Sequence, residues 1–326
     1  MKALLISPVF HGYWSAFAAA LEALDFDVTV HCYDAPGVRN ALAHRAPGSA
    51  LAARVRATAT DAAVRSLAAA DPDVVLVVKG DALGTNWWQA LAQSRARSAL
   101  WLYDELGRMR YDDATIGSVD RVFSYSSGDA RALRGRGIDA DVLPDGFDSL
   151  TPFRARWSNR TSLIGARYAE RERLLRVLSD AGEAVEAYGR EWSRSPWDVL
   201  RTARWRGAGV PAHGDIDRAT YYGVMAGSTA TLNIHGDGHD GFSMRTYEAP
   251  GVGALQIIDR ADVAQHYEVG VETLVFQSDD ELVDHVRRSR RDERWARGIR
   301  EAGRRRTLAE HTIVHRMRKV REAWLS

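Results

Sequence analysis

The sequence feature that most constrains the fold is an uninterrupted aliphatic segment at 74–78, which lies between two segments of helical periodicity. Apolar residues recur at helical spacing over 50–70 before it and over 87–95 after it. A strand without a polar side chain is buried on both faces, and parallel sheets covered by helices on both sides bury their strands in that way. The segment therefore predicts a doubly wound α/β sheet.

The same alternation of strand and helix fills the first half of the chain. A helix is expected over 13–24, and further strands are expected at 2–6, 28–32, 99–103, 121–125 and 140–143. A Pro144-Asp145-Gly146 turn then interrupts the pattern, which makes 147–158 the expected linker.

A second alternation follows the linker. It predicts strands at 162–164, 185–188, 229–234 and 254–258, and helices at 171–181, 218–226, 244–251 and 279–290. A length of 326 residues corresponds to about two domains of typical size. We therefore expect two Rossmann-like domains, 1–150 and 151–326. Ligands of such sheets bind at the carboxyl ends of the strands, so a cleft between the two domains is the expected site.

Charge and cysteine content restrict the class of partner and the compartment. The 44 basic and 43 acidic residues leave a net charge of +1, so any binding of nucleic acid or anionic lipid must be local. The single cysteine, Cys32, forms no internal disulfide, which is typical of a reducing compartment. No apolar run approaches the length of a membrane span, and the first residues do not form a signal peptide. We therefore expect a soluble, cytoplasmic protein.

The richest cluster of polar residues is the segment 231–253, in which an apolar strand, a glycine-rich loop and a helix follow one another. Glycines let the backbone approach a ligand closely, and amides at the start of a helix can bind an anion such as a phosphate. Glu248 lies one to two turns into the helix, where its carboxylate could reach a ribose. An ordinary polar loop is an equally good interpretation of the glycines alone.

Several motifs in this half resemble one known family. Asp240 and Glu248 have the spacing of the family's acidic pair, and Gly165 is followed six residues later by Arg171. Further matching segments are Glu248-Ala-Pro-Gly-Val-Gly253, Tyr188-Gly189 with Trp192, Leu232-Asn233-Ile234, and Glu310-His311-Thr312 with Arg316. On these residues the chain resembles the group 1 GT-B glycosyltransferases, and in particular their CgeB-like (spore-maturation protein) branch.

The resemblance implies a GT-B fold, with two doubly wound Rossmann-like domains facing across a cleft and a C-terminal helix able to pack back on the first domain. It implies a hexosyltransferase-like enzyme that takes a sugar from a nucleoside diphosphate sugar, linked to UDP or GDP, and transfers it to an unidentified acceptor. In the family the first acidic residue lies near the donor sugar and the second binds the ribose. Asp240 departs from the usual Glu, which leaves the donor sugar open.

The diphosphate of such a donor must be stabilised as the glycosidic bond breaks, and arginine guanidinium groups can do so without a metal. Arg171 and Arg245 are the candidates, although a solvated helix face and a surface cap are the plainer interpretations. The remaining expected contacts to the nucleotide sugar are Gly165, His235, Gly241, Phe242 and Ser243. His235, Asp237 and His239 could suggest a metal, but no third soft ligand accompanies the two histidines, so neither a metal nor a resident cofactor is expected.

The candidate catalytic residues are His11, Asp104 and Asp240. His11 follows the first strand in a His-Gly turn, where a general base could reach an acceptor hydroxyl. Asp104 ends a strand of the first sheet and could contact the acceptor or act as a base. A loop histidine without a chemical task and a helix N-cap are the plainer interpretations of these two residues. The acidic spacing slightly favours retention of configuration, whereas His11 is the argument for inversion.

Two basic segments concern the acceptor, which could be a glycan, a small molecule, a protein or DNA. Residues 190–206 contain five arginines and three tryptophans, and 287–306 are also arginine-rich. Arginines interleaved with aromatic rings can bind a single strand, although such segments are more often solvated helix faces. Two other functions stay open, namely a non-catalytic protein that binds a sugar nucleotide or a glycan and a sugar-nucleotide epimerase.

Overall fold

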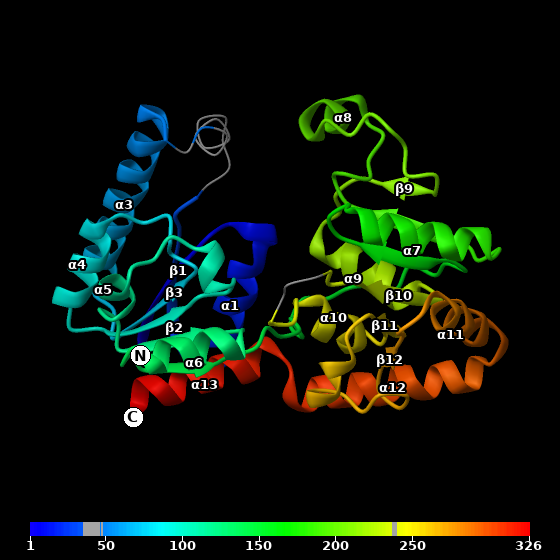
Figure 1. The fold of residues 1–326 in the computed structure, drawn as a ribbon. Helices are drawn as coiled ribbons and strands as arrows, with labels where there is room; N and C mark the ends of the chain where they lie inside the picture. Colours follow the sequence, from blue (N-terminus) through cyan, green and yellow to red (C-terminus); the bar gives the residue numbers. More distant parts are fainter. Residues whose placement is uncertain (35–45, 47, 237–239) are drawn as a thin grey trace. The chain divides into compact units, whose positions relative to one another are not determined.

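The computed structural model describes residues 1–34, 46, 48–236 and 240–326 (Figure 1). The chain divides into two compact units. Unit 1 consists of Met1–Asp145, His239–Phe242 and Ile313–Ser326, and unit 2 of Gly146–Gly238 and Ser243–Thr312.

Unit 1 is built on a parallel sheet whose described strands lie in the order β2-β1-β3-β4-β5-β6. The strands are β1 (Lys2–Ser7), β2 (Asp27–Cys32), β3 (Val74–Val78), β4 (Arg97–Trp101), β5 (Arg121–Ser124) and β6 (Ala140–Val142). The helices are α1 (Tyr13–Glu22), α3 (Ala50–Ala70), α4 (Thr85–Gln93), α5 (Asp113–Ile116) and α6 (Ser127–Gly135), with short 3₁₀ turns η1 (Phe10–Gly12) and η2 (Leu106–Arg108). All five side chains of β3 are buried, as the apolar segment predicts.

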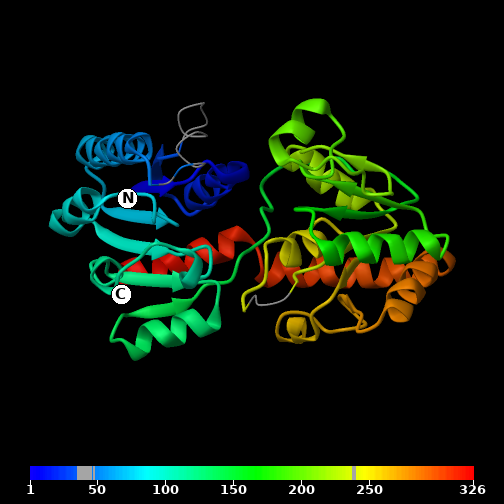
Figure 2. The same ribbon diagram turned by 45° about the horizontal axis from the view of Figure 1, so that its top comes forward.

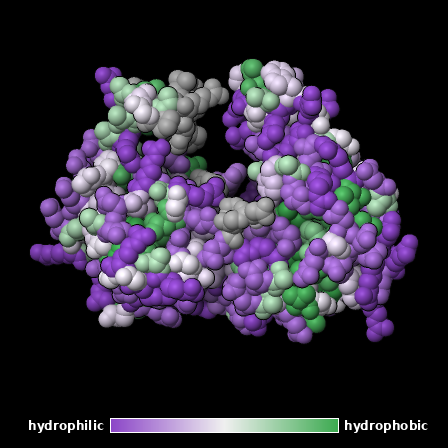
Figure 3. All heavy atoms as spheres, in the orientation of Figure 1, coloured by the Kyte–Doolittle hydropathy of each residue, from purple (hydrophilic) through white to green (hydrophobic). Residues whose placement is uncertain are grey.

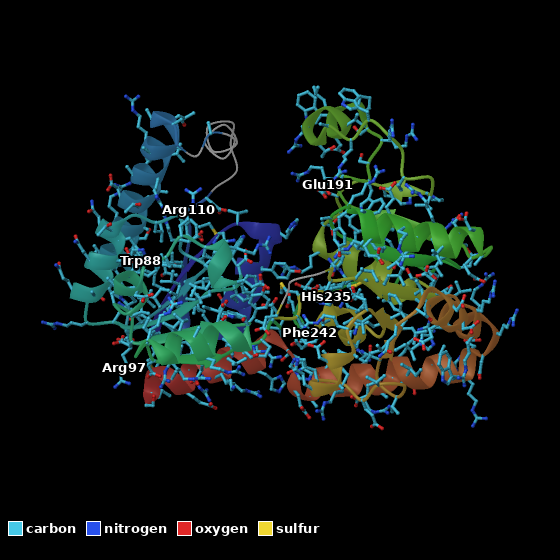
Figure 4. The ribbon with its side chains drawn as sticks, in the orientation of Figure 1. Trp88, Arg97, Arg110, Glu191, His235 and Phe242 are labelled. Carbon is cyan, nitrogen blue, oxygen red and sulfur yellow. The ribbon has the colours of Figure 1, made fainter. Side chains whose placement is uncertain are left out.

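Both faces of this sheet are covered. One core contains Leu4 and Ile6 of β1 together with Leu67 of α3 and Trp87 of α4. Figure 4 labels Trp88, which is also buried in that core. Alternating side chains of one strand point to opposite faces, so the strands have to be apolar throughout.

The C-terminal helix α13 (Ile313–Leu325) belongs to unit 1, where it packs against α1 (Figures 1 and 2). The ring of Trp324 contacts Phe26 edge-on with centroids 5.6 Å apart. Arg97 of β4 donates to the carbonyl of Trp324 at 2.7 Å. The last residues of the chain therefore complete a domain that begins with the first.

Unit 2 has a second parallel sheet, whose described strands lie in the order β12-β11-β10-β7-β8-β9. The strands are β7 (Thr161–Ile164), β8 (Val185–Tyr188), β9 (Ala212–His213), β10 (Ala230–Asn233), β11 (Gln256–Ile258) and β12 (Leu274–Val275). The helices are α7 (Ala169–Asp180), α8 (Pro196–Thr202), α9 (Arg218–Gly227), α10 (Arg245–Gly251), α11 (Asp279–Arg291) and α12 (Glu293–Glu310), with the 3₁₀ turn η3 (Ala261–Gln265). α7, α11 and α12 bury leucine, valine and isoleucine side chains in one core with β7 and β10.

Each sheet reverses its winding direction at one place. In unit 1 the chain passes from β1 outward to β2 and then continues with β3 on the other side of β1. In unit 2 it passes from β7 outward to β8 and β9, and then continues with β10 on the other side of β7. Ligands of open α/β sheets bind at the carboxyl ends of strands beside such reversals. The loops after β1 and β3 in unit 1, and after β7 and β10 in unit 2, therefore have the positions of binding loops.

The prediction of two doubly wound α/β sheets is confirmed. The expected strands and helices occur close to their predicted ranges, whereas β9, β12, α5, α6 and α8 were not predicted and α12 was given no range. Within the described residues, no helix has both the length and the apolar character needed to cross a bilayer.

Candidate functional site

Two arginine side chains meet beside one glycine at the carboxyl edge of the unit 2 sheet. Gly165 directly follows β7 and has a φ of 144°, which favours glycine. A Cβ at this position would lie 2.7 Å from Nη1 of Arg171 and 2.8 Å from Nη2 of Arg245. The glycine therefore provides the space in which both guanidinium groups lie against the backbone.

Arg171 is the better bonded of the two arginines. It extends from α7 and is only 7% exposed, which excludes the solvated-face interpretation. Its Nε and Nη2 donate to the carbonyl of Ile234 at 3.1 and 2.5 Å, and its Nη1 donates to the carbonyl of Ala166 at 2.9 Å. The guanidinium also lies 4.4 Å from the ring centroid of Tyr168. Burial, and next the positive charge of Arg245, lower the pKa of Arg171 to about 10, so it remains charged at neutral pH.

Arg245 begins α10 and is poorly bonded. Its Nη1 lies 3.4 Å from Oδ1 of Asn233, and its Nε is buried without a hydrogen-bond partner. Arg245 is half-buried, and no carboxylate forms an ion pair with either Arg171 or Arg245 in the described part of the chain. Two like charges held together without an ion-pair partner repel one another, and an anionic ligand would relieve that repulsion.

Glu248 lies one helical turn further along α10 and is 1% exposed. Its Oε2 accepts a hydrogen bond from the Tyr221 hydroxyl at 2.7 Å, and its Oε1 accepts one from the Tyr222 hydroxyl at 3.1 Å. Burial raises the pKa of both tyrosines, and the charge of Glu248 raises them further, so both hydroxyls are donors at neutral pH. A buried carboxylate fixed by two phenols is a preorganised acceptor of further hydrogen bonds.

His235 lies in the loop that follows β10, at the same edge of the unit 2 sheet as the two arginines (Figure 4). Its Nδ1 lies 3.2 Å from Oδ1 of Asp259, and its Nε2 accepts a 3.4 Å contact from the backbone N–H of Ser243. These contacts assign the proton of the neutral ring to Nδ1. Burial lowers the pKa of His235, although the Asp259 carboxylate partly opposes that effect. The ring therefore stays neutral and fixes the start of α10 against the end of β11.

No group of three or more His, Cys, Asp and Glu side chains within the described residues could hold a metal ion. Asp237 and His239, which the sequence suggests beside His235, lie outside the described residues.

In unit 1 the loops after three neighbouring strands hold a non-glycine residue in the left-handed region. His11 follows β1 with a φ of 43°, Lys79 follows β3 with 62°, and Tyr103 follows β4 with 59°. Such conformations cost about 1–2 kcal/mol each and cluster at ligand sites. Nζ of Lys79 lies 3.0 Å from Oδ2 of Asp104, so Asp104 forms an ion pair at this edge. His11 is exposed in η1.

The segment Asp240–Phe242 also packs on unit 1. Oδ2 of Asp240 accepts hydrogen bonds from the Ser126 hydroxyl at 2.6 Å and from the backbone N–H of Gly128 at 2.8 Å, at the start of α6. Gly241 lies against the Tyr125 ring, with which a Cβ would collide, and Phe242 is 4% exposed. Asp240 therefore supports the capping of α6 from outside the helix, by accepting from its N-cap Ser126 and from a first-turn N–H.

The structure thus places the eleven candidate residues in two groups. Gly165, Arg171, His235, Ser243, Arg245 and Glu248 lie together in unit 2, and His11, Asp104, Asp240, Gly241 and Phe242 belong to unit 1. Their roles stay predictions. The sequence interpretation missed Tyr221, Tyr222 and Asp259. Asp259 directly follows a strand of the same sheet, and this position could have identified it.

Comparison with known proteins supports the class of the unit 2 domain. Residues 167–322 match the family model described as glycosyl transferase-like. This range includes Arg171, His235, Arg245 and Glu248. No curated protein matches the sequence significantly.

Solved structures of the same fold cover both units. Sucrose-phosphate synthase from Thermosynechococcus elongatus is 16% identical with a TM-score of 0.65, covering 99% of this chain and 98% of that chain. The DNA modifying enzyme β-glucosyltransferase, solved with and without its substrate uridine diphosphoglucose, is 14% identical with a TM-score of 0.63, covering 100% of both chains. A protein described as a UDP-N-acetylglucosamine 2-epimerase from Listeria monocytogenes is 14% identical with a TM-score of 0.64, covering 99% and 95%. The fold is that of the GT-B glycosyltransferases, which an epimerase shares. The CgeB-like branch stays a prediction.

Proposed function

We propose that the protein is a glycosyltransferase that transfers a sugar from a nucleoside diphosphate sugar to an acceptor hydroxyl. The glycosyl transferase-like family match over 167–322 supports the class. Among the proteins of this fold, β-glucosyltransferase uses uridine diphosphoglucose, and a UDP- or GDP-linked sugar is the donor that we infer here.

The observation that carries the proposal is the guanidinium of Arg245, which forms no ion pair within the described residues and has a buried Nε without a hydrogen-bond partner, beside the charged Arg171. When the bond between the sugar C1 and the phosphate oxygen breaks, its electron pair stays on the nucleoside diphosphate. Two guanidinium groups fixed beside that oxygen would stabilise the developing charge through short, charge-assisted hydrogen bonds. Arg171 cannot turn freely because two carbonyls hold it, so the pair is preorganised.

Glu248 is proposed to bind the ribose of the same nucleotide. Its carboxylate lies one turn along α10 from Arg245, and its two oxygens are already oriented by Tyr221 and Tyr222. A ribose hydroxyl would add a donor to a carboxylate that can accept more than two hydrogen bonds.

Transfer is proposed to need neither a metal nor a resident cofactor, because arginine side chains can supply the positive charge at the diphosphate. Chelation by EDTA should then leave the activity unchanged. Activity that vanishes with EDTA and returns with manganese would overturn this part of the proposal.

The acceptor is proposed to bind at the carboxyl edge of the unit 1 sheet, where His11, Lys79 and Asp104 follow strands β1, β3 and β4. His11 would take the proton of the attacking hydroxyl if the reaction inverts the anomeric centre. A general base contributes about 100- to 10,000-fold. An effect of His11→Ala below tenfold, or a product that keeps its configuration, would remove that role. The spacing of Asp240 and Glu248 slightly favours a reaction that retains the configuration of the anomeric centre.

The first experiment is a thermal-shift screen of UDP, GDP and their sugars, followed by an assay of donor consumption. A ligand at about 100 times its Kd adds about 2.7 kcal/mol to the stability. Stabilisation with transfer to an acceptor or slow hydrolysis supports the proposal. Stabilisation without turnover would identify a non-catalytic binding protein, and conversion of the donor sugar without an acceptor would identify an epimerase. No stabilisation by any nucleotide would overturn the site.

A further inference from the structure

An exposed surface of tryptophan, leucine and arginine side chains lies at the edge of unit 2, on α8 and the segment that follows it. Trp197, Leu200 and Trp205 are 66%, 62% and 72% exposed. Of the ten large apolar side chains that are exposed in the described residues, these three fall within nine residues. Apolar side chains gathered in this way on a surface mark an interaction site. We call these residues, with Arg194, Arg201 and Arg206, the α8 surface.

The α8 surface projects from the unit although its base is fixed. α8 follows β8 and precedes the edge strand β9, beyond the layers of the unit 2 sheet (Figures 1 and 2). Figure 3 shows green and pale atoms at this end of unit 2, with hydrophilic purple atoms around them. Below it, Nη1 of Arg167 donates to the carbonyl of Arg206 at 2.8 Å, and Nη2 of Arg204 donates to the carbonyl of Arg167 at 3.1 Å. The exposed side chains are thus presented by a fixed loop.

The charge of the α8 surface is positive. Arg194, Arg201 and Arg206 are exposed, and none of them forms an ion pair in the described part of the chain. Asp198 is the acidic residue within the stretch 194–206. The surface therefore complements a negatively charged partner.

We propose that the α8 surface docks on an anionic lipid bilayer. Trp197 and Leu200 are three residues apart on α8, so they lie on one side of the helix. Tryptophan favours the level of the headgroups, an aliphatic side chain favours the acyl boundary beneath them, and arginines bind lipid phosphates. A single-stranded nucleic acid would stack on the tryptophans but would leave Leu200 in water. This inference does not depend on the proposed glycosyltransferase activity.

The test is co-sedimentation of the full chain with phosphatidylcholine vesicles and with vesicles that also contain phosphatidylglycerol. We expect binding to the anionic vesicles only. This binding should weaken as the salt concentration rises, because the Debye screening length shortens from about 8 Å at 0.15 M to about 3 Å at 1 M. The triple variant Trp197→Ser, Leu200→Ser, Trp205→Ser should reduce partitioning by at least about tenfold, because it removes most of the exposed apolar area. Each of Arg194→Gln and Arg201→Gln should reduce it about fivefold.

The matched control is Trp157→Ser, which removes a tryptophan that is 85% exposed in the segment before β7. It should leave partitioning within about twofold, since a surface substitution elsewhere changes little. Because all these positions are exposed, we expect each variant to have the melting temperature of the wild type. Failure to bind anionic vesicles at low salt, or an equal loss with Trp157→Ser, would overturn the proposal. Binding of a DNA oligonucleotide that the triple variant abolishes, without vesicle binding, would overturn it in favour of a nucleic-acid partner.

Discussion

The hydroxyl of Tyr221 donates to Oε2 of Glu248 at 2.7 Å, so a carboxylate that is 1% exposed is already oriented before any ligand arrives. Tyr222 fixes the other oxygen from the same helix, α9. These two hydrogen bonds to the Glu248 carboxylate therefore join α9 to α10. If Glu248 binds the ribose as proposed, nucleotide affinity and the stability of unit 2 both depend on this side chain, so a test of Glu248 has to separate the two.

Glu248→Gln should weaken UDP binding about 10- to 150-fold, the loss of about 1.5–3 kcal/mol expected when a charged hydrogen bond is removed. Gln keeps the volume and one acceptor oxygen, whereas Ala would leave both tyrosine hydroxyls unpaired and destabilise the unit. Isothermal titration gives the affinity. Glu183→Gln is the control, because Glu183 also has a largely covered carboxylate, 8% exposed, but precedes β8, at the amino end of the sheet, and pairs with Arg287 and Arg290. Equal affinities of Glu248→Gln and the wild type would remove the ribose assignment.

Arg245→Met should weaken UDP about 10- to 150-fold and leave the binding of uridine unchanged, because only the diphosphate meets the guanidinium. The unfolding temperature of Arg245→Met without ligand should equal or exceed that of the wild type. Arg245 makes a long hydrogen bond to Asn233, and its charge repels that of Arg171. Arg173→Met, which removes an exposed arginine of α7 paired with Glu170 and Asp279, provides the comparison. If uridine and UDP weaken equally, Arg245 holds the fold and does not contact the phosphates.

The stability of the protein should fall as the pH drops below about 6.5, in part because of His235. Its folded pKa is below its unfolded value, so the unfolded state binds more protons as the pH falls through the unfolded pKa of about 6.5. The contribution of the neutral ring is complete above that value and is lost as the pH falls toward the folded pKa. Denaturant titrations at several pH values should show a shallower acid slope for His235→Gln than for the wild type. Identical slopes would contradict the buried neutral ring.

Asp240→Ala should lower the free energy of unfolding by about 0.5–2 kcal/mol, the range for loss of a helix cap. Asp240→Asn should lower it less, because Asn keeps an oxygen that can accept from Ser126 and Gly128. The sugar-contact hypothesis makes the opposite prediction, a loss of turnover at unchanged stability. Chemical denaturation and donor consumption measured on the same variants decide between the two.

Trp324→Ala should destabilise unit 1 by about 3–5 kcal/mol, as expected for removal of a buried tryptophan. Its ring is 2% exposed and packs on Phe26. Leu325→Ala changes the next residue, which is 62% exposed, and should stay within about 0.5 kcal/mol. A small effect of Trp324→Ala would mean that α13 contributes little to the unit.

Much of this structure could be predicted from the sequence because apolar runs such as 74–78 report burial directly. The family resemblance and the chemistry of a diphosphate pointed to Gly165, Arg171, Arg245 and Glu248, and the structure brings these residues to one edge of the sheet, where the strand ends converge. The partners of Glu248 were not predicted, since the side of α9 that faces α10 is fixed by packing. β9 and β12 have two residues each, too few for any periodicity to appear. The capping contact of Asp240 was also missed, because spacing along a chain does not reveal which unit a loop packs on.

The division of the chain into two units also determines which segments could be exchanged with those of another protein of the same fold. Unit 1 receives Asp240–Phe242 from the middle of the sequence and α13 from its end. A chimera that exchanges Gly146–Thr312 for the corresponding segment of another protein of this fold would therefore import a foreign loop onto α6. Such a chimera should fold when Asp240 is transferred together with Ser126 and Gly128, and when α13 stays with unit 1. The residues that have to be exchanged together are thus defined by the unit that they contact, and not by one continuous range of the sequence.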